Sequence, residues 1–223
     1  MPTHRFPLLL AIGAFLLFST STVAFAAGTA FSPAVGQICR AHTLAAEQRH
    51  QLPKLVLSAI SLAESGRWHP GQRASYPWPW TVTSGSKSMY FDDKDSAIAA
   101  VRRLQAQGVR NIDVGCMQVN LRYHPDAFDD LSEAFEPAAN ADYAAGFLRD
   151  LFQETRSWDR AIGRYHSATP VRAQGYLLKV KTLWRDERVR NAQLRREAVK
   201  AAYRQRQQAL RAARAETAAP TDS

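Results

Sequence analysis

One carboxylate, Glu64, lies near the end of a run of mostly apolar or small residues, LPKLVLSAISLAESG (residues 52–66). If this run is a helix, its macrodipole is negative at this end and disfavours a carboxylate. The side chains of Ile60 and Leu57, one and two turns back, would keep water from the carboxyl group and raise its pKa further. A carboxyl group that stays protonated near neutral pH can act as a general acid on a glycosidic bond. The alternatives are a surface position or an ion pair with Arg67.

Two tryptophans, Trp78 and Trp80, follow this acid in the segment SYPWPWTV (residues 75–82), where Pro77 and Pro79 restrict the backbone. Flat rings exposed beside an acid could stack on sugar faces in a polysaccharide groove. Because tryptophan also packs well into protein cores, the second interpretation places both rings in the core.

Other kinds of reactive site have little support. The sequence contains no HExxH or CxxC motif and no dense His/Asp cluster, so we expect neither a metal site nor a cofactor. It also lacks a G-x-S-x-G elbow and a glycine-rich phosphate loop. A Cys–His nucleophile pair, with Cys116 and His166 or His124, is formally possible, but no local pattern supports it.

The elements that must position these residues are mostly helical, which predicts one mainly α domain over residues 27–184. The first helix is expected to begin at Pro53 and to stop at Gly66. Residues 93–108 should form a second helix, with Asp92 or Asp95 as its cap and Gly108 as its terminator. Further helices are expected over residues 140–153, capped by Asn140, and over residues 157–166 and 172–184.

One segment departs from the helical pattern. Residues 81–83 and 89–91 are β-prone and flank the turn sequence SGSK (residues 84–87), which predicts a single small β-hairpin. We find no internal repeat.

Residues 185–223 are expected to form a basic helical tail with a frayed, partly disordered end. The chain has a net charge of +9, of which residues 179–223 contribute +7. Leu194, Val199 and Leu210 do not sustain a heptad repeat, so a solvated, semi-independent helix is the first expectation. The alternatives are contact with an anionic polymer or membrane surface, or docking to a partner. Nucleic acid is not an expected partner of an exported chain, and in this stretch only Tyr203 could stack on a base.

Residues 1–26 have the features of a signal peptide. A short basic start precedes an apolar run at residues 8–18. Ala24 and Ala26 occupy the two small-residue positions that a signal peptidase recognises before its cleavage site. The apolar run is shorter than the about 20 residues that a membrane-crossing helix needs. We therefore expect an exported, periplasmic protein without a stable membrane span; an uncleaved N-terminal anchor is the alternative.

The two cysteines, Cys39 and Cys116, fit an oxidising compartment. There an even pair is more often a disulfide than two free thiols. A bridge would close a long loop and stabilise the fold by about 4 kcal/mol in the chain-entropy description. The alternative is two separately buried thiols.

Three blocks in order resemble the motifs of soluble lytic transglycosylases: AESG (residues 63–66), DVGCMQVN (residues 113–120) and AIGRYHS (residues 161–167). This family belongs to the goose-type lysozyme superfamily, glycoside hydrolase family 23. The resemblance extends from about residue 38 to residue 176. It is closest to the small exported transglycosylases that accompany secretion and conjugation machineries.

The resemblance implies a lysozyme-like domain that cleaves the MurNAc–GlcNAc β-1,4 bond of peptidoglycan without a cofactor. Glu64 would protonate the leaving oxygen and then accept the proton of the MurNAc 6-hydroxyl, which closes on the anomeric carbon to give 1,6-anhydroMurNAc. Because this mechanism uses a single acid, it explains why the sequence shows no evident second catalytic carboxylate. Asp113 and the acids in residues 92–95 could supply one, but nothing in the sequence places them in the site. The implied partners are glycan strands and, through the tail, a secretion or conjugation apparatus.

The resemblance also assigns substrate-site roles to four residues. Gln118 matches a glutamine that bonds substrate groups, and Met117 matches a groove-lining position. Ser65 matches the serine beside the acid, and Tyr165 matches a tyrosine whose hydroxyl orients the acid.

Two positions depart from the family pattern. Cys116 replaces the common leucine, which fits a bridge to Cys39. His166 replaces the common asparagine; it cannot copy both hydrogen bonds of an amide, so it either donates to substrate or packs. Two other functions remain open: a lysozyme-type hydrolase at the same site, and a non-catalytic peptidoglycan-binding assembly factor recruited through the tail.

Overall fold

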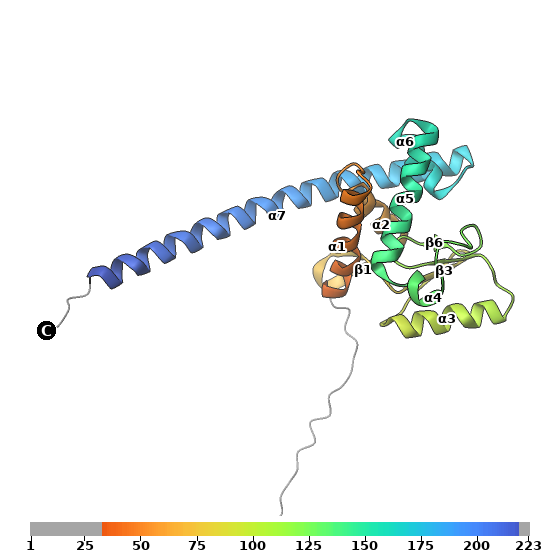
Figure 1. Cartoon of the computed structure of the whole chain (residues 1–223), viewed down its shortest axis with the longest axis horizontal. Coiled ribbons are helices and arrows are strands. Elements are labelled where there is room, and N and C mark those ends of the chain that lie inside the picture. Colours follow the sequence, from red (N-terminus) through yellow and green to blue (C-terminus); the bar gives the residue numbers. More distant parts are fainter. Residues whose placement is uncertain (1–32, 219–223) are drawn as a thin grey trace, which may run out of the picture.

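Helices dominate the part of the chain described by the computed structural model, residues 33–218 (Figure 1), and the expected signal peptide at residues 1–26 lies outside it. The helices are α1 (Pro33–Arg49), α2 (Val56–Ser65), α3 (Lys94–Ala106), α4 (Leu131–Ala134), α5 (Pro137–Thr155), α6 (Trp158–His166) and α7 (Pro170–Ala218). The strands are β1 (Gly66–His69), β2 (Ala74–Pro77), β3 (Thr81–Ser84), β4 (Lys87–Tyr90), β5 (Ile112–Val114) and β6 (Val119–Asn120). The predicted mainly α class with a small β part is confirmed.

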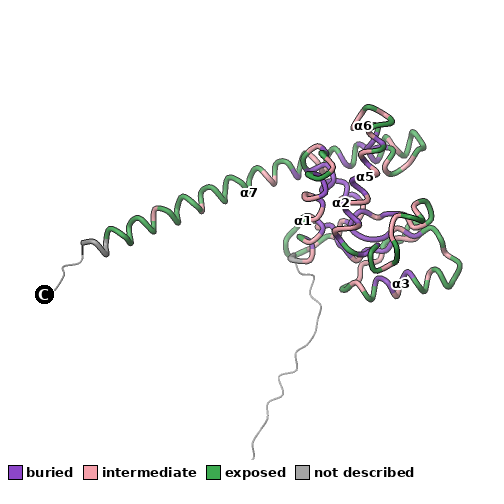
Figure 2. The backbone as a smooth tube through the Cα atoms, viewed as in Figure 1, coloured by how far each residue is buried: buried purple, intermediate pink, exposed green. Residues whose placement is uncertain are grey.

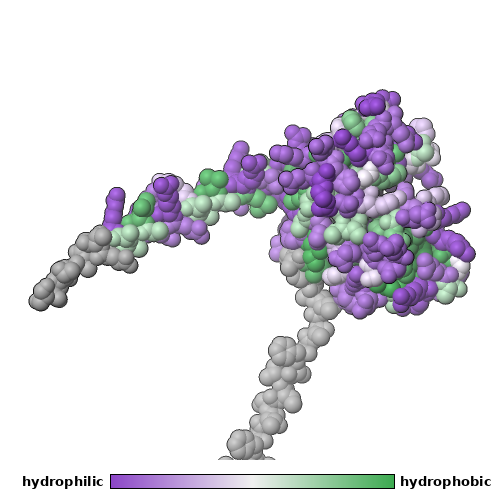
Figure 3. All heavy atoms as spheres, viewed as in Figure 1, coloured by the Kyte–Doolittle hydropathy of each residue, from purple (hydrophilic) through white to green (hydrophobic). Residues whose placement is uncertain are grey.

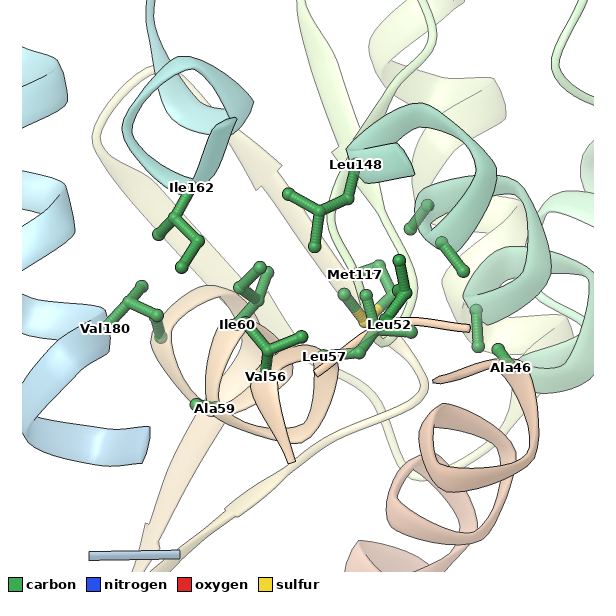
Figure 4. Close-up of a cluster of buried hydrophobic side chains, with 14 of the residues drawn as sticks. Ala46, Leu52, Val56, Leu57, Ala59, Ile60, Met117, Leu148, Ile162 and Val180 are labelled. Atoms are coloured by element: carbon green, nitrogen blue, oxygen red, sulfur yellow. The ribbon is translucent and has the colours of Figure 1, made fainter. Parts of the chain in front are cut away.

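Helix α2 is the central element of the core. Almost all of its residues are buried (Figure 2), and it packs against both α1 and α7. Its residue Ile60 lies among Ile162 of α6, Val180 of α7 and other apolar side chains of one cluster (Figure 4). An apolar helix buried on nearly every side explains why its sequence shows a run of apolar and small residues instead of a single stripe.

The start of α2 is set by an acid from another helix. The carboxylate of Glu47, in the last turn of α1, accepts the backbone N–H groups of Leu55 at 2.7 Å, Leu57 at 2.8 Å and Ser58 at 3.1 Å. Leu55 has a left-handed backbone with φ 70°, so the helix begins at Val56 and not at Pro53 as expected. The prediction was wrong because the cap is distant in sequence.

Replacing Glu47 with alanine is expected to lower the free energy of unfolding by about 2 kcal/mol, since buried N–H groups lose their acceptor. Chemical denaturation would measure the loss. Gln48→Ala removes an exposed side chain from the same helical turn and should change the free energy of unfolding little. Equal stability of the two variants would contradict this account of α2.

Two other helix starts also differ from the expectation. The cap of α3 is Asp93, whose carboxylate accepts the Ser96 N–H at 2.7 Å, and not Asp92 or Asp95. Helix α5 begins at Pro137, so Asn140 lies inside it and is no cap. The Asn140 amide is buried, accepts the Met117 N–H at 2.8 Å and donates to Val114 O at 3.1 Å. It therefore ties α5 to the β5–β6 turn.

The β part is larger than the single hairpin expected. Strands β3 and β4 form that hairpin, with Ser84 opposite Lys87 and Gly85 at φ 61° in the turn. Strands β5 and β6 extend it to the order β4-β3-β5-β6, and β1 pairs with β2 in a second sheet. These additional strands are two to four residues long, too short for an alternating pattern to reveal them.

A disulfide joins Cys39 on α1 to Cys116 in the β5–β6 turn, across a sequence separation of 77 residues. The predicted bridge is confirmed, and the alternative of two free thiols is wrong. The bridge fixes the turn that carries DVGCMQVN against the helical core.

Helix α7 runs without a break through the expected boundary between residues 184 and 185. Its first half packs on α2 and α6, with Tyr176 and Val180 buried. The packing continues into the expected tail, where buried Glu187 forms an ion pair with Arg40 of α1. The rest of the helix projects from the domain (Figure 1). None of the helices in residues 33–218 combines the length and the hydropathy of a membrane-spanning segment.

Candidate active site

Glu64 is the next-to-last residue of α2, as expected. The helix stops there because the chain turns sharply into β1: a Cβ atom on Gly66 would lie only 2.4 Å from the carbonyl oxygen of Leu62. Glycine at this point lets the strand leave directly behind the acid, so the carboxyl group lies at a fixed helix end.

The Glu64 side chain contributes to a pocket of about 360 Å³ that opens to solvent between α2, α6 and the first turns of α7. The pocket is lined by Ala63, Glu64, His166, Val171, Arg172, Gly175, Tyr176 and Lys179. A second cavity, between α1, β2 and α7, holds only about 10 Å³ and has no room for a ligand. The pocket that contains Glu64 is the larger of these two and is taken as the candidate site.

The pKa of Glu64 is raised to about 7, chiefly because the surrounding protein keeps water from the half-buried carboxyl group. The Tyr176 hydroxyl and the Lys179 ammonium oppose this by stabilising the carboxylate, whereas the negative charge of Asp113 raises the pKa further. Lys179 is held in place because its Nζ donates to Ala63 O at 2.6 Å. Near neutral pH, both the acid and the carboxylate forms of Glu64 are populated.

Two tyrosines lie beside this acid. The hydroxyl of Tyr165 donates to Met117 O at 2.9 Å, so its proton is not directed at Glu64 as the resemblance implied. Burial, and then the charge of Glu64, raise the pKa of Tyr165 well above its ordinary value. The Tyr176 hydroxyl lies close enough to the Glu64 carboxyl group to lower its pKa, but the two are not hydrogen-bonded in this structure. Tyr176 was not expected in the site.

Three of the expected substrate residues are absent from the lining of the pocket at Glu64. Ser65 is buried, and its hydroxyl donates to Cys116 O at 2.8 Å. Met117 is fully buried in the core and lines no open groove. Gln118, with φ 49°, donates from Nε2 to Thr81 O at 3.0 Å and to Gly115 O at 2.9 Å. Its Oε1 is buried without a hydrogen-bond partner.

The two tryptophans differ in burial. Trp78 is only 2% exposed, and its Nε1 donates to Phe91 O at 2.5 Å, so the groove interpretation of Trp78 is corrected to a core position. Trp80 is half-buried and packs edge-to-face on Trp78, with ring centroids 6.2 Å apart. The guanidinium of Arg67 lies 4.7 Å from the centre of the Trp78 ring.

His166 and Asp113 complete the surroundings of the acid. His166 is exposed at the pocket, and its ring stacks on Tyr176 at a centroid distance of 4.6 Å. The protein around the pocket still keeps some water from the ring, and this effect, followed by the charge of Lys179, lowers the pKa of His166 and favours the neutral ring. Partial burial raises the pKa of Asp113, although Asn120 Nδ2 donates to it at 2.8 Å. Asp113 is the first residue of the DVGCMQVN block (residues 113–120). Its place in that block was the only feature of the sequence that pointed to a position near Glu64.

The raised pKa of Glu64 makes folding stability depend on pH. Ionising this carboxyl group is harder in the folded state, so its own contribution to stability is fully present below its ordinary pKa of 4.5 and is lost as the pH rises through about 7. We expect Glu64→Gln to melt above the wild type at about pH 8 and at the same temperature at about pH 4. Thermal melts at both pH values measure this. If the difference in melting temperature between Glu64→Gln and the wild type is the same at both pH values, the raised pKa of Glu64 is contradicted.

Among residues 33–218, no group of three or more His, Cys, Asp or Glu side chains is placed to hold a metal ion. No family model, no curated protein and no solved structure matches the chain.

Proposed function

We propose that the protein is a peptidoglycan lytic transglycosylase in which Glu64 is the only general acid and base. The observation that carries the proposal is a glutamic acid with a pKa of about 7 at the end of a buried helix, in a pocket that opens to solvent. An acid in this range can both donate and accept a proton at neutral pH. The order of the AESG, DVGCMQVN and AIGRYHS blocks supports the choice of substrate.

In the proposed reaction, protonated Glu64 donates its proton to the glycosidic oxygen while the bond between that oxygen and C1 of MurNAc breaks. The 4-hydroxyl of GlcNAc leaves with this proton. The 6-hydroxyl oxygen of the same MurNAc then bonds to C1, and its proton passes to the Glu64 carboxylate. Glu64 ends in its starting form, and no water is consumed.

The groups around the acid suit this double role. Burial keeps Glu64 protonated before the reaction, while Tyr176 and Lys179 favour the carboxylate that must exist between the two steps. Arg172 and Lys179 make one wall of the pocket cationic, which suits a glycan whose peptide stems carry carboxylates. An exported protein acting in the periplasm, close to a secretion or conjugation apparatus, is part of the proposal.

Asp113 favours a second candidate function, hydrolysis of the same bond. Its charge acts on Glu64, which places a second carboxylate near the acid, and hydrolases normally use two. In that reaction Asp113 would stabilise the positive charge at C1, and water would complete the cleavage. The product would then carry a free reducing end.

Asp113→Asn separates the two functions. For a transglycosylase we expect the rate to fall by less than about tenfold, well short of the loss of a general acid. The loss of a negative charge near Glu64 should also lower the pKa of that acid and move the alkaline limb of the rate profile to lower pH. Rates measured across pH test this. A loss as large as that of Glu64→Gln would favour the hydrolase.

The proposed activity itself is tested on purified, dye-labelled sacculi. The wild type should release soluble dye, and Glu64→Gln should not. Binding of the wild type to sacculi without release would contradict the proposal and favour a non-catalytic assembly factor.

A further inference from the structure

The outer half of α7, residues 185–214, carries apolar side chains that no other described element covers. Val189 is 54% exposed, Val199 70%, Tyr203 64% and Leu210 46%. In Figure 3, hydrophobic and hydrophilic side chains alternate along this projecting helix. Exposed apolar residues along a helix that has left its domain are unusual unless another surface covers them.

These four residues belong to one regular repeat. Residues 189, 196, 203 and 210 recur every seven positions, and residues 192, 199, 206 and 213 follow each of them by three. This spacing of three and four is that of a coiled-coil seam. We call these eight positions the heptad stripe: Val189, Ala192, Arg196, Val199, Tyr203, Arg206, Leu210 and Ala213. Leu194 is not one of these positions. For that reason Leu194, Val199 and Leu210 taken together show no heptad repeat, although Val199 and Leu210 both belong to the stripe.

Charges on and beside the stripe have one sign. Arg196 and Arg206 lie within it, and the flanking e and g positions hold only basic, Gln or Ala residues. The basic flanking residues are Arg188, Arg195, Lys200 and Arg214. Two copies of this helix would bring like charges together along the whole seam, which disfavours a homodimer. A helix lying in a membrane interface would need a continuous apolar face, and the two seam arginines interrupt it.

The base of the outer half is anchored to the domain. The ion pair between Glu187 and Arg40 fixes it to α1, and Trp184 Nε1 donates to Lys54 O at 2.8 Å. From this base the stripe spans about 36 Å at the rise of an α-helix. A pre-formed helix of this length pays little ordering cost when another helix pairs with it.

We propose that the heptad stripe is a docking surface for an acidic amphipathic helix of a partner protein. Such a helix would place apolar side chains against Val199, Tyr203 and Leu210, and carboxylates against the seam arginines and their basic flanks. The partner would hold the domain at the end of a helical arm, with the Glu64 pocket left uncovered. This inference does not rest on the proposed activity.

The test uses the full chain and a synthetic peptide of about four heptads with Leu at a and d, Glu at e and g, and Glu also at the two seam positions that face Arg196 and Arg206. Fluorescence anisotropy of the labelled peptide should show binding, and a peptide with Lys at e and g should not bind. The variant Val199→Gln/Tyr203→Gln/Leu210→Gln should weaken binding at least about tenfold, because the seam loses its apolar contacts. Leu194→Gln is the matched control, since Leu194 is 51% exposed on the other side of the same helix.

Several outcomes would overturn the proposal. Equal loss of binding in Leu194→Gln, or binding of the Lys peptide, would show that the stripe does not select its partner. Tight binding to phosphatidylglycerol vesicles that the triple variant loses would assign the stripe to a membrane surface. A dimer in sedimentation that the triple variant loses would assign it to a second copy. Release of dye from sacculi should be the same in all these variants, and circular dichroism should show unchanged helix content.

Discussion

Replacing Glu64 with glutamine is expected to reduce the rate of glycan cleavage by about 10²–10⁴-fold, the usual contribution of general acid–base catalysis. The amide has nearly the same shape as the carboxyl group but cannot donate a proton to the leaving oxygen. The fold should persist, because none of the hydrogen bonds that hold α2 in place comes from the Glu64 side chain; its start is held by Glu47. Release of soluble fragments from sacculi gives the rate, and a thermal melt gives the stability.

A matched control removes the same charge elsewhere. Glu154 is exposed on α5 and pairs with Arg164 at 2.8 Å, outside the pocket. Glu154→Gln should keep the wild-type rate, because Glu154 does not line the pocket. The variant should also stay folded, because a surface ion pair contributes little to stability. A wild-type rate in Glu64→Gln would remove Glu64 from its proposed role, whatever the stability of the variant.

Removing the disulfide by Cys39→Ala/Cys116→Ala is expected to lower the free energy of unfolding by about 4 kcal/mol in the chain-entropy description. The size of the effect follows from the 77-residue separation that the bridge spans. The bridge also holds the turn whose Cys116 carbonyl accepts the Ser65 hydroxyl and whose Met117 carbonyl accepts the Tyr165 hydroxyl. Activity should therefore fall with stability, because this turn holds Ser65, the residue next to Glu64, and Tyr165, which lies beside the acid.

The loss should appear as a lower denaturant midpoint and as a melting temperature lower by roughly 10 °C. Dithiothreitol should destabilise the wild type by a similar amount and should leave the double variant unchanged. A double variant as stable as the oxidised wild type would contradict the structural role of the bridge.

Local sequence signals predicted the elements that depend on local interactions. The stop of α2 at Gly66 and the hairpin around Gly85 follow from backbone geometry that nearby residues decide. Where a distant residue decides, the prediction was wrong. Glu47 caps α2 from another helix. Asn140 was expected to cap a helix because asparagine often does so, but it lies inside α5 and binds the β5–β6 turn.

The same division holds for the candidate site. Glu64 was predicted from its own helix, because a carboxyl group at an apolar helix end is unusual wherever the rest of the chain lies. Tyr176 and Lys179 come from α7, more than a hundred residues later, and only packing brings them to the acid. Trp78 and Met117 have the residue types of a sugar-binding groove but lie in the core. Their types do not distinguish a groove from a core.

The mass of the soluble products from purified sacculi tests the central claim most directly. Fragments released by the wild type should end in 1,6-anhydroMurNAc and be one water lighter than the hydrolysed fragments, and Glu64→Gln should release none. Fragments with hydrated reducing ends, or the same anhydro fragments from Glu64→Gln, would contradict the account.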